Sequence, residues 1–334
     1  MSGPLNPSRI IEIATAYWGS ATLIAACELD IFTTLSNGTQ TAQAIATEQK
    51  LDRAATDALL AGCAGLGLVT KHGDVFQNTD IAEAYLVNGK PGFLGPALAY
   101  NGDVYPLWGE LATVIQQGRA TASPDQYLGD DESRTRNFVY GMHHRALGVG
   151  RAVAQVIDLK GCTRLADIGG GPGTYSALLT QQTPNLKATV LDLPGVVAIA
   201  EEIVASMSAS EAVTCMPFDY YRDDLHISYD AALISGVLHR EQPDGARALI
   251  AKAAGNLEPG GVFYISDVML DDDRAGPLFG TMFALNMRVL AHDGRCHSVA
   301  EQKAWLEEAG CIVRDVTRLP APINYTVIRA EKGV

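Results

Sequence analysis

Apolar residues recur with helical periodicity in the first part of the chain. The segments IIEIATAYWGSATLIAACELDIFTTL and TAQAIATEQKLDRAATDALLAGCAGLGLV repeat apolar positions at helical spacing, and the second predicts two helices joined near Leu51. Two short strands follow around Gly73, and a further helix begins near Asp80. Helices followed by a hairpin are the order of a winged helix-turn-helix, so residues 1–95 are predicted to form a winged-helix domain of all-α class.

The pattern of apolar residues changes at Cys162, where short apolar runs begin to alternate with helical segments. Strands are predicted at 164–168, 188–191, 213–216, 231–235, 262–266, 312–317 and 325–329. The segment 256–261 is predicted to be a turn that leads into a buried strand. Residues 96–158 are predicted to be linker helices, and residues 159–334 a second domain. Alternating strands and helices are typical of a doubly wound, Rossmann-like α/β fold.

The charge of the chain argues against nucleic acid as a partner. The 334 residues carry a formal net charge of −13, a field that repels phosphate backbones and anionic membranes. In the predicted second and third helices Lys50 and Arg53 are opposed by Glu48, Asp52 and Asp57. A helical dimerisation or lid module is therefore favoured over a DNA-binding domain.

Other features of the sequence predict a cytoplasmic protein. No segment is long and apolar enough to be expected to span a membrane, and the first residues lack the basic start of a signal peptide. The six cysteines are scattered without a CxxC pair. Reduced thiols are expected, with neither a disulfide framework nor a metal site.

A glycine-rich segment, DIGGGPG, ends the first predicted strand of the second domain. Gly169, Gly171 and Gly173 give a loop without Cβ atoms, on whose backbone a ligand can lie. A P-loop is excluded, because Thr174 and Tyr175 follow where Lys and Ser or Thr are needed. Thr174 also stands where a dinucleotide fingerprint has its third glycine. The spacing instead fits an S-adenosylmethionine loop that begins at Asp167.

Acidic residues also follow the next two strands. Asp192 ends the second strand, where a carboxylate is suited to accept both ribose hydroxyls of a nucleoside. Asp219 follows the third strand and is assigned to the adenine amino group, with Tyr220 against the ring. Leu193, which follows Asp192, and Ser235, at the end of the predicted strand 231–235, are assigned to the same cofactor site. Each acid alone would suit a helix cap, but three successive strand ends with acids favour cofactor binding.

At these motifs the chain resembles the small-molecule O-methyltransferases of the caffeic acid, acetylserotonin and hydroxyneurosporene type. The resemblance rests on DIGGGPG, LDLP, FDYY, LHREQPDGARALIAKAAGNLEPGG, FALNMRVLAHDGR and AEQKAWLEEAGC, and it spans nearly the whole chain. It implies a seven-stranded class I methyltransferase domain that binds S-adenosylmethionine. It further implies a homodimer formed through the winged-helix domain and a small-molecule methyl acceptor.

The resemblance assigns the base that takes the acceptor's proton to His239, in ISGVLHRE. Arg240 and Glu241 depart from the Asp-Trp that usually follows. The two acids that flank the family's histidine correspond to Asp267, which is shorter than the usual Glu, and to Cys296, which cannot orient an imidazole as a carboxylate does. The base machinery is therefore expected to be weaker than in the family.

Acceptor-binding candidates come from three segments. Adjacent histidines on a helix point in different directions, so at most one of the pair in FVYGMHHRA is expected to face the acceptor. Asn286 stands among apolar neighbours and needs partners. An arginine beside these segments is a candidate anchor for an acceptor carboxylate, and Arg288 is expected at the surface. The candidates are Tyr105, Trp108, Tyr140, Met142, His143, His144, Arg145, Met282, Asn286 and Met287, with Phe283 beside them.

Three other functions remain open from the sequence. S-methylation of a carboxylated thioether, as in the methylthio-hydroxybutyrate type, needs no base because sulfur carries no proton. C-methylation is also compatible with the fold. A winged-helix metabolite sensor without turnover is a third alternative, although the negative charge and His239 argue against it.

Overall fold

The computed structural model describes residues 6–120, 132–291 and 294–334. The chain divides into two compact units, Met1–Tyr105 and Pro106–Val334. The division falls within helix α7 (Gly95–Gly109), which carries Pro106 in its interior. The three-part division at residues 95 and 158 stays a prediction.

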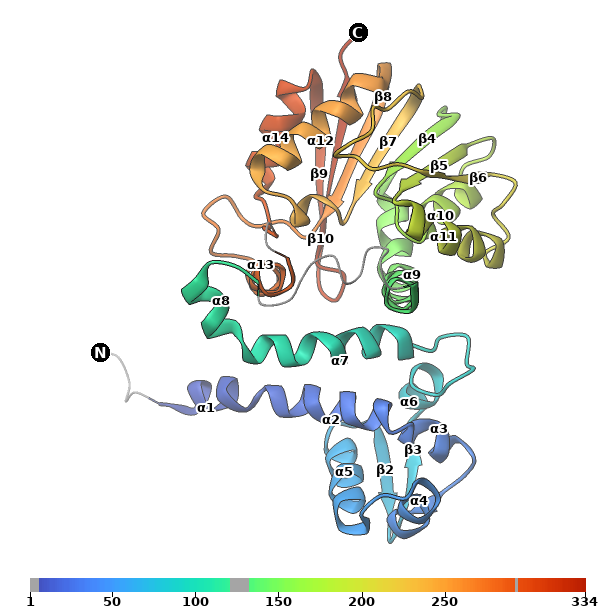
Figure 1. Cartoon of the computed structure of the whole chain (residues 1–334), viewed down its shortest axis with the longest axis vertical. Coiled ribbons are helices and arrows are strands. Elements are labelled where there is room, and N and C mark those ends of the chain that lie inside the picture. Colours follow the sequence, from blue (N-terminus) through green and yellow to red (C-terminus); the bar gives the residue numbers. More distant parts are fainter. Residues whose placement is uncertain (1–5, 121–131, 292–293) are drawn as a thin grey trace. The chain divides into compact units, whose positions relative to one another are not determined.

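The first unit is a helical domain with a small sheet (Figure 1). Its helices are α1 (Ser8–Thr15), α2 (Tyr17–Glu28), α3 (Ile31–Ser36), α4 (Ala42–Gln49), α5 (Arg53–Gly65) and α6 (Asp80–Tyr85). The predicted hairpin is present as β2 (Val69–His72) and β3 (Val75–Asn78), and the short β1 (Gln40–Thr41) pairs with β3. The all-α class is thus too narrow, because a three-stranded sheet packs with the helices around a core that includes Phe32, Leu60 and Phe76.

Helices α1 and α2 expose much of their apolar surface. Ile10, Ile13 and Trp18 are each more than half exposed. By length and composition alone, the stretch Ser8–Glu28 would suffice to cross a membrane, with a mean hydropathy of 1.4 and 6% of its apolar window buried. The sequence-based expectation that no segment meets this measure is wrong. An exposed apolar face of this size indicates a contact surface.

The second unit holds a seven-stranded sheet. Its strands are β4 (Arg164–Ile168), β5 (Lys187–Asp192), β6 (Val213–Pro217), β7 (Tyr229–Ser235), β8 (Leu257–Asp267), β9 (Cys311–Leu319) and β10 (Tyr325–Lys332). Its helices are α8 (Leu111–Gln117), α9 (Glu132–Val156), α10 (Thr174–Gln182), α11 (Pro194–Ser206), α12 (Pro243–Asn256), α13 (Leu278–Leu290) and α14 (Val299–Glu308), with a 3₁₀ turn η2 at Leu238–Arg240. All seven strands lie where the sequence predicts them, and the class I fold is confirmed.

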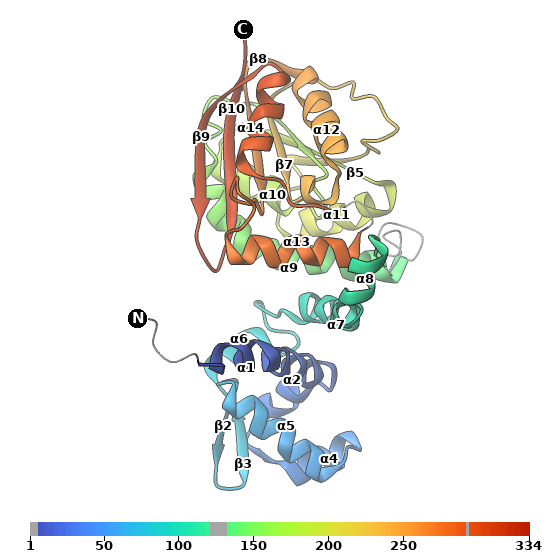
Figure 2. The same cartoon turned by 90° about the vertical axis from the view of Figure 1, so that its left-hand side faces the viewer.

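The strand order is β6-β5-β4-β7-β8-β10-β9. The first five run parallel, whereas β10 is antiparallel to β8 and to β9. Helices α12 and α14 pack on one face of the sheet, and α9, α10 and α11 pack on the other (Figure 2). The order reverses between β4 and β7, so a ligand is expected beyond the carboxyl ends of these two strands.

One predicted turn is wrong. The segment 256–261 was expected to be a turn, but β8 begins at Leu257 and runs through Pro259 and Gly260. Leu257 pairs with Tyr229 of β7, and the register shifts before the next paired residue, Ala231. The Pro-Gly signal therefore marks an irregularity inside a strand, as such residues often do.

Candidate active site

The carboxyl ends of the parallel strands bring the predicted cofactor residues to one edge of the sheet. Asp167 lies in β4, Asp192 ends β5, and Asp219 follows β6, so the three acids stand on neighbouring strands. We call the ends of β4, β5 and β6 the loop side. His239 follows β7, and Asp267 ends β8. We call the ends of β7 and β8 the base side.

The glycine loop leaves its backbone bare. Gly169 and Gly171 have φ of 68° and 54°, a region that favours glycine. A Cβ at Gly169 would lie 2.6 Å from Val237 Cγ2, whereas a Cβ at Gly171 would meet no atom within 4 Å. The loop thus packs closely against Val237 at Gly169, and it has free space at Gly171. This arrangement fits a ligand that lies on the backbone itself.

Two carboxylates hold this loop. The N–H of Gly171 donates to Asp192 Oδ2 at 2.7 Å, and the N–H of Leu193 donates to Asp192 Oδ1 at 2.8 Å. Ser176 Oγ donates to Asp167 Oδ2 at 2.7 Å, while Asp167 Oδ1 is buried without a partner. Burial raises the pKa of Asp167 to about 7 and also raises that of Asp192. An unpartnered buried oxygen beside bare backbone fits the polar end of S-adenosylmethionine.

The third acid has a different setting. Asp219 Oδ1 accepts from the N–H of Tyr221 and is partly exposed. The hydroxyl of Tyr220 donates to Glu241 Oε1 at 2.6 Å, and that of Tyr221 donates to Glu241 Oε2. Glu241 is 3% exposed. The family departure at Glu241 thus creates a buried carboxylate held by two tyrosines, an arrangement that the sequence did not predict.

The base side holds a histidine–carboxylate pair. His239 Nδ1 donates to Asp267 Oδ1 at 2.6 Å, and the N–H groups of His239 and Val268 donate to the same carboxylate. Both side chains are largely buried. Asp267 therefore orients the imidazole despite being shorter than Glu. Cys296 is 1% exposed, and burial and the charge of Asp267 raise the pKa of its thiol, so it stays neutral beside the pair.

A second histidine supports the turn that presents His239. His297 Nε2 lies 3.1 Å from the carbonyl oxygens of Leu238 and Glu241, to which it donates, and its ring packs edge-on against Trp305. The N–H of Arg295 donates to the carbonyl of His239. His297 was not predicted from the sequence, because its partners are backbone atoms of a distant segment and leave no pattern in the sequence.

Helix α13 contributes an aromatic side chain that contacts the pair. The ring of Phe283 packs edge-on against His239, with centroids 4.9 Å apart, and stacks on Phe279. Asn286 finds the partner it needed, because Trp108 Nε1 donates to its Oδ1 at 2.9 Å. Met287 is buried and Met282 is 44% exposed. The structure therefore joins α13 to the segment around Trp108.

The candidates on α9 separate from one another. His143 is buried, and its Nδ1 lies 2.8 Å from Thr174 Oγ1 at the start of α10. Burial lowers the pKa of His143 to about 4 and also lowers that of His144. Tyr140 instead turns its hydroxyl to Glu202 on α11. His143 thus contacts the residue that follows the glycine loop.

The remaining candidates are placed less closely. Ser235 ends β7, on the base side next to the loop side. Met142 is half-buried on α9. Arg145, also on α9, lies over the ring of Phe283 at 5.6 Å. Tyr105 belongs to the first unit and is 37% exposed. Over the residues that the structure describes, no cluster of three or more His, Cys, Asp or Glu is arranged to hold a metal.

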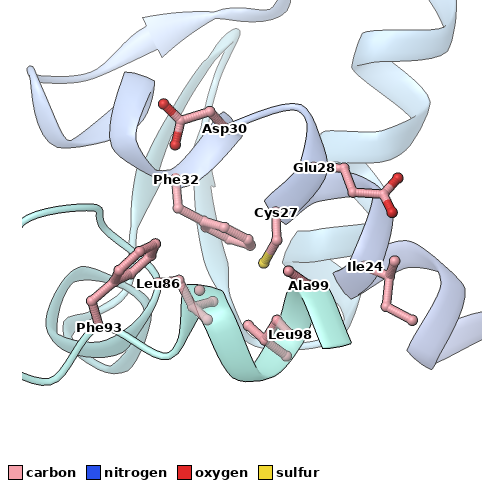
Figure 3. Close-up of a pocket in the computed structure, with 10 residues that line it drawn as sticks. Ile24, Cys27, Glu28, Asp30, Phe32, Leu86, Phe93, Leu98 and Ala99 are labelled. Carbon is pink, nitrogen blue, oxygen red and sulfur yellow. The ribbon is translucent and has the colours of Figure 1, made fainter. Parts of the chain in front are cut away.

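The first unit contains a cavity of about 160 Å³ (Figure 3). Apolar side chains, including Phe32 and Leu98, line most of it, and the carboxylates of Glu28 and Asp30 lie at its margin. Burial raises the pKa of the Cys27 thiol in its wall to about 12, so this thiol is unreactive. No candidate cofactor or acceptor residue lines the cavity, and the predicted chemistry lies in the second unit.

Comparison with known proteins agrees with this geometry. Residues 108–311 match the O-methyltransferase domain, and residues 11–88 match the O-methyltransferase dimerisation domain. The chain is 30% identical to the 3-hydroxy-5-methyl-1-naphthoate 3-O-methyltransferase of Streptomyces sahachiroi, over 98% of this chain and 96% of that protein. It is 29% identical to the tetracenomycin polyketide synthesis 8-O-methyl transferase of Streptomyces glaucescens, over 98% of both.

A solved structure gives the same result. The complex of human N-acetylserotonin methyltransferase with S-adenosylmethionine superposes with a TM-score of 0.87 and 26% identity, covering all of both chains. The chain belongs to the O-methyltransferase family. It is an S-adenosylmethionine-dependent O-methyltransferase of small molecules, and it carries the family's dimerisation domain.

Proposed function

We propose that the acceptor is an aromatic molecule with a phenolic hydroxyl, and that His239 is the general base that takes its proton. The observation that carries this proposal is the 2.6 Å hydrogen bond from His239 Nδ1 to Asp267, because it leaves Nε2 as the acceptor nitrogen. Phe283 lies edge-on to the imidazole and offers an aromatic wall to a flat acceptor. Relatives named for a hydroxynaphthoate and for tetracenomycin support an aromatic acceptor.

The proton follows a short path in this proposal. Nε2 of His239 accepts it from the hydroxyl, and the Asp267 carboxylate stabilises the imidazolium that forms. Two backbone N–H groups keep Asp267 in place, so the pair needs no rearrangement during the reaction. S-methylation of a thioether would have no use for such a pair, because the sulfur carries no proton to remove.

The loop side would hold the cofactor. Asp192 lies next to the bare backbone of Gly171 and is proposed to accept from the ribose hydroxyls, with Asp219 and Tyr220 toward the adenine. Asp167 Oδ1 is proposed to accept from a donor at the amino-acid end. Bound S-adenosylmethionine supplies an electrophilic methyl group on a sulfonium sulfur. His143, bound to Thr174, would keep the start of α10 in position.

The protein is further proposed to be a homodimer formed through the first unit. The dimerisation domain matches residues 11–88, and the exposed apolar side chains of α1 and α2 include Ile11, Ile13 and Trp18 within that range. Burying such a face against a second copy would remove it from water. The net charge of −13 disfavours anionic membranes and nucleic acid as alternatives for the same face.

The base is tested by replacing His239 with Gln. Turnover of a phenolic acceptor is expected to fall by about 10²–10⁴, while the affinity for S-adenosylhomocysteine stays unchanged. Asp267→Asn is expected to lower turnover less, because the imidazole keeps its place but loses its counter-charge. A near-normal turnover with an unchanged pH profile in His239→Gln would reject general-base catalysis and favour transfer by proximity alone.

A further inference from the structure

Arg145 is a half-buried cation without a carboxylate partner among the described residues. It lies in the middle of α9, away from the helix ends. On the same helix, Arg136 forms an ion pair with Glu202. Arg288 also lacks an ion pair in the described part of the chain, but it stands in the last turn of α13, where a cation stabilises the helix end. Arg145 has no such role.

The surroundings of Arg145 place it between the loop side and the base side. Its guanidinium lies 5.6 Å from the ring of Phe283, which also contacts His239. Burial raises the pKa of the Tyr175 hydroxyl and of the Tyr325 hydroxyl, and the charge of Arg145 opposes both rises. Tyr175 follows Thr174 after the glycine loop, and Tyr325 begins β10.

The distance from Tyr325 to the base is also short. A Cβ at Gly236 would lie 3.8 Å from both the hydroxyl of Tyr325 and Cε1 of His239. Tyr325 is next to Thr326, which pairs with Asp267 across the sheet. Arg145 therefore shares its neighbourhood with the catalytic pair that is proposed above.

The nearby carboxylates do not neutralise Arg145. Both oxygens of Asp267 accept from His239 or Val268. Asp167 accepts from Ser176 through one oxygen, and its other oxygen has no partner. A guanidinium that lies over an aromatic face can still donate hydrogen bonds from its in-plane N–H groups. Two of these N–H groups are spaced to donate to the two oxygens of a carboxylate.

We propose that Arg145 binds a carboxylate of one of the two reactants, so that this methyl-transfer site is built for an anionic group between the glycine loop and His239. This inference rests on the proposed function. Two reactants can carry the group: an acceptor that is an aromatic hydroxy acid, and the amino-acid end of the cofactor. A bidentate contact to either would pair the charge of Arg145 and fix that reactant relative to the base.

The test compares Arg145→Gln with wild type for four ligands. S-adenosylhomocysteine and 5′-methylthioadenosine, which lacks the amino-acid end, are titrated by calorimetry. 3-Hydroxy-1-naphthoate and 2-naphthol, which lacks the carboxylate, are titrated into enzyme saturated with S-adenosylhomocysteine. Arg151→Gln is the matched control, because Arg151 is an exposed arginine on the same helix. Arg145→Lys keeps the positive charge but removes the paired N–H donors of the guanidinium.

We expect Arg145→Gln to weaken the binding of one of the two ligands that carry a carboxylate by roughly ten- to a hundredfold. The binding of the matching ligand without the carboxylate should stay within about twofold of wild type. A selective loss for the naphthoate identifies the acceptor as the source, and a selective loss for S-adenosylhomocysteine identifies the cofactor. Arg145→Lys should recover part of the lost affinity, and Arg151→Gln should match wild type. Unchanged binding of all four ligands, or equal losses within each pair, would overturn the proposal.

These titrations need no turnover. A wrong assignment of His239 would appear in the turnover of His239→Gln and would leave the Arg145 titrations intact. A wrong assignment of Arg145 would leave the turnover result intact. The two failures are therefore distinguishable.

Discussion

Asp167 on the loop side and Asp267 on the base side differ in how fully their carboxylate oxygens are satisfied. On the loop side, Asp167 Oδ1 has no partner and the backbone at Gly171 faces open space. On the base side, both oxygens of Asp267 accept hydrogen bonds, and His239 is fixed by one of them. The Asp167 carboxylate thus has an oxygen free for a ligand, whereas the His239–Asp267 pair is organised before any reactant binds. Binding energy is thus expected mainly from the loop side, and rate from the base side.

The largest expected effect tests how tight the loop is. Gly169→Ala places a Cβ against Val237 at a positive φ, and we expect a loss of stability of roughly 2–4 kcal/mol together with the loss of S-adenosylhomocysteine binding. Denaturant unfolding and calorimetry measure the two effects.

Gly171→Ala is the matched control for Gly169→Ala, because its Cβ meets no protein atom. We expect it to cost only about 1 kcal/mol of stability and still to weaken ligand binding. A stable Gly169→Ala protein with normal binding would contradict the difference between the two sides of the loop.

The next effect concerns His143, which is bound to the start of α10. Burial lowers its pKa from 6.5 to about 4, so the folded protein prefers the neutral ring. The corresponding stability is complete above about pH 6.5 and is lost as the pH falls toward 4, by up to roughly 3 kcal/mol. His143→Asn should flatten the pH dependence of the urea midpoint between pH 7 and 4.5. The exposed His226→Asn is the control, and an equal flattening there would count against the assignment.

A smaller effect concerns Asp167, whose Oδ1 has no hydrogen-bond partner. Because burial raises the pKa of Asp167 to about 7, this group is about half protonated at neutral pH in the free protein. A hydrogen-bond donor of the cofactor favours the ionised form, so binding should release a fraction of a proton and tighten as the pH rises through 7. Calorimetry in two buffers of different ionisation enthalpy measures this release. Proton release that persists unchanged in Asp167→Asn would exclude Asp167 as its source.

The smallest expected effect lies on the acceptor segments. Trp108→Phe removes the donor to Asn286 and should cost about 1 kcal/mol. A double-mutant cycle with Asn286→Leu, followed by denaturant unfolding, measures the coupling between the two side chains. A coupling near zero would mean that the contact does not join α13 to the segment around Trp108.

The sequence predicted the loop side better than the base side. Asp167, the glycines and Asp192 belong to short segments whose strand–loop–helix context is local. In the seven-stranded sheet, every strand end except the start of β8 was found within three residues of its observed position. Trp108 and Asn286 are 178 residues apart, and no local pattern predicts that they meet. Tyr325 and His297 were missed for the same reason, because each reaches the site through the packing of distant elements.

The expectation of weakened base machinery illustrates a further limit. It compared residue types, Asp267 for Glu and Cys296 for an acid, and it did not include the position of the main chain. The end of β8 brings Asp267 to 2.6 Å from His239 Nδ1, so side-chain length alone was a poor guide. The cysteine leaves one carboxylate rather than two beside the imidazole.

The position of β10 has a consequence for how the protein is made. This strand lies between β8 and β9 in the sheet although it is the last of them to leave the ribosome. The catalytic domain therefore cannot close its sheet, or bring Tyr325 near His239, until β10 has been synthesised. Until β10 inserts, β8 presents an open edge, at which strands of other chains can pair.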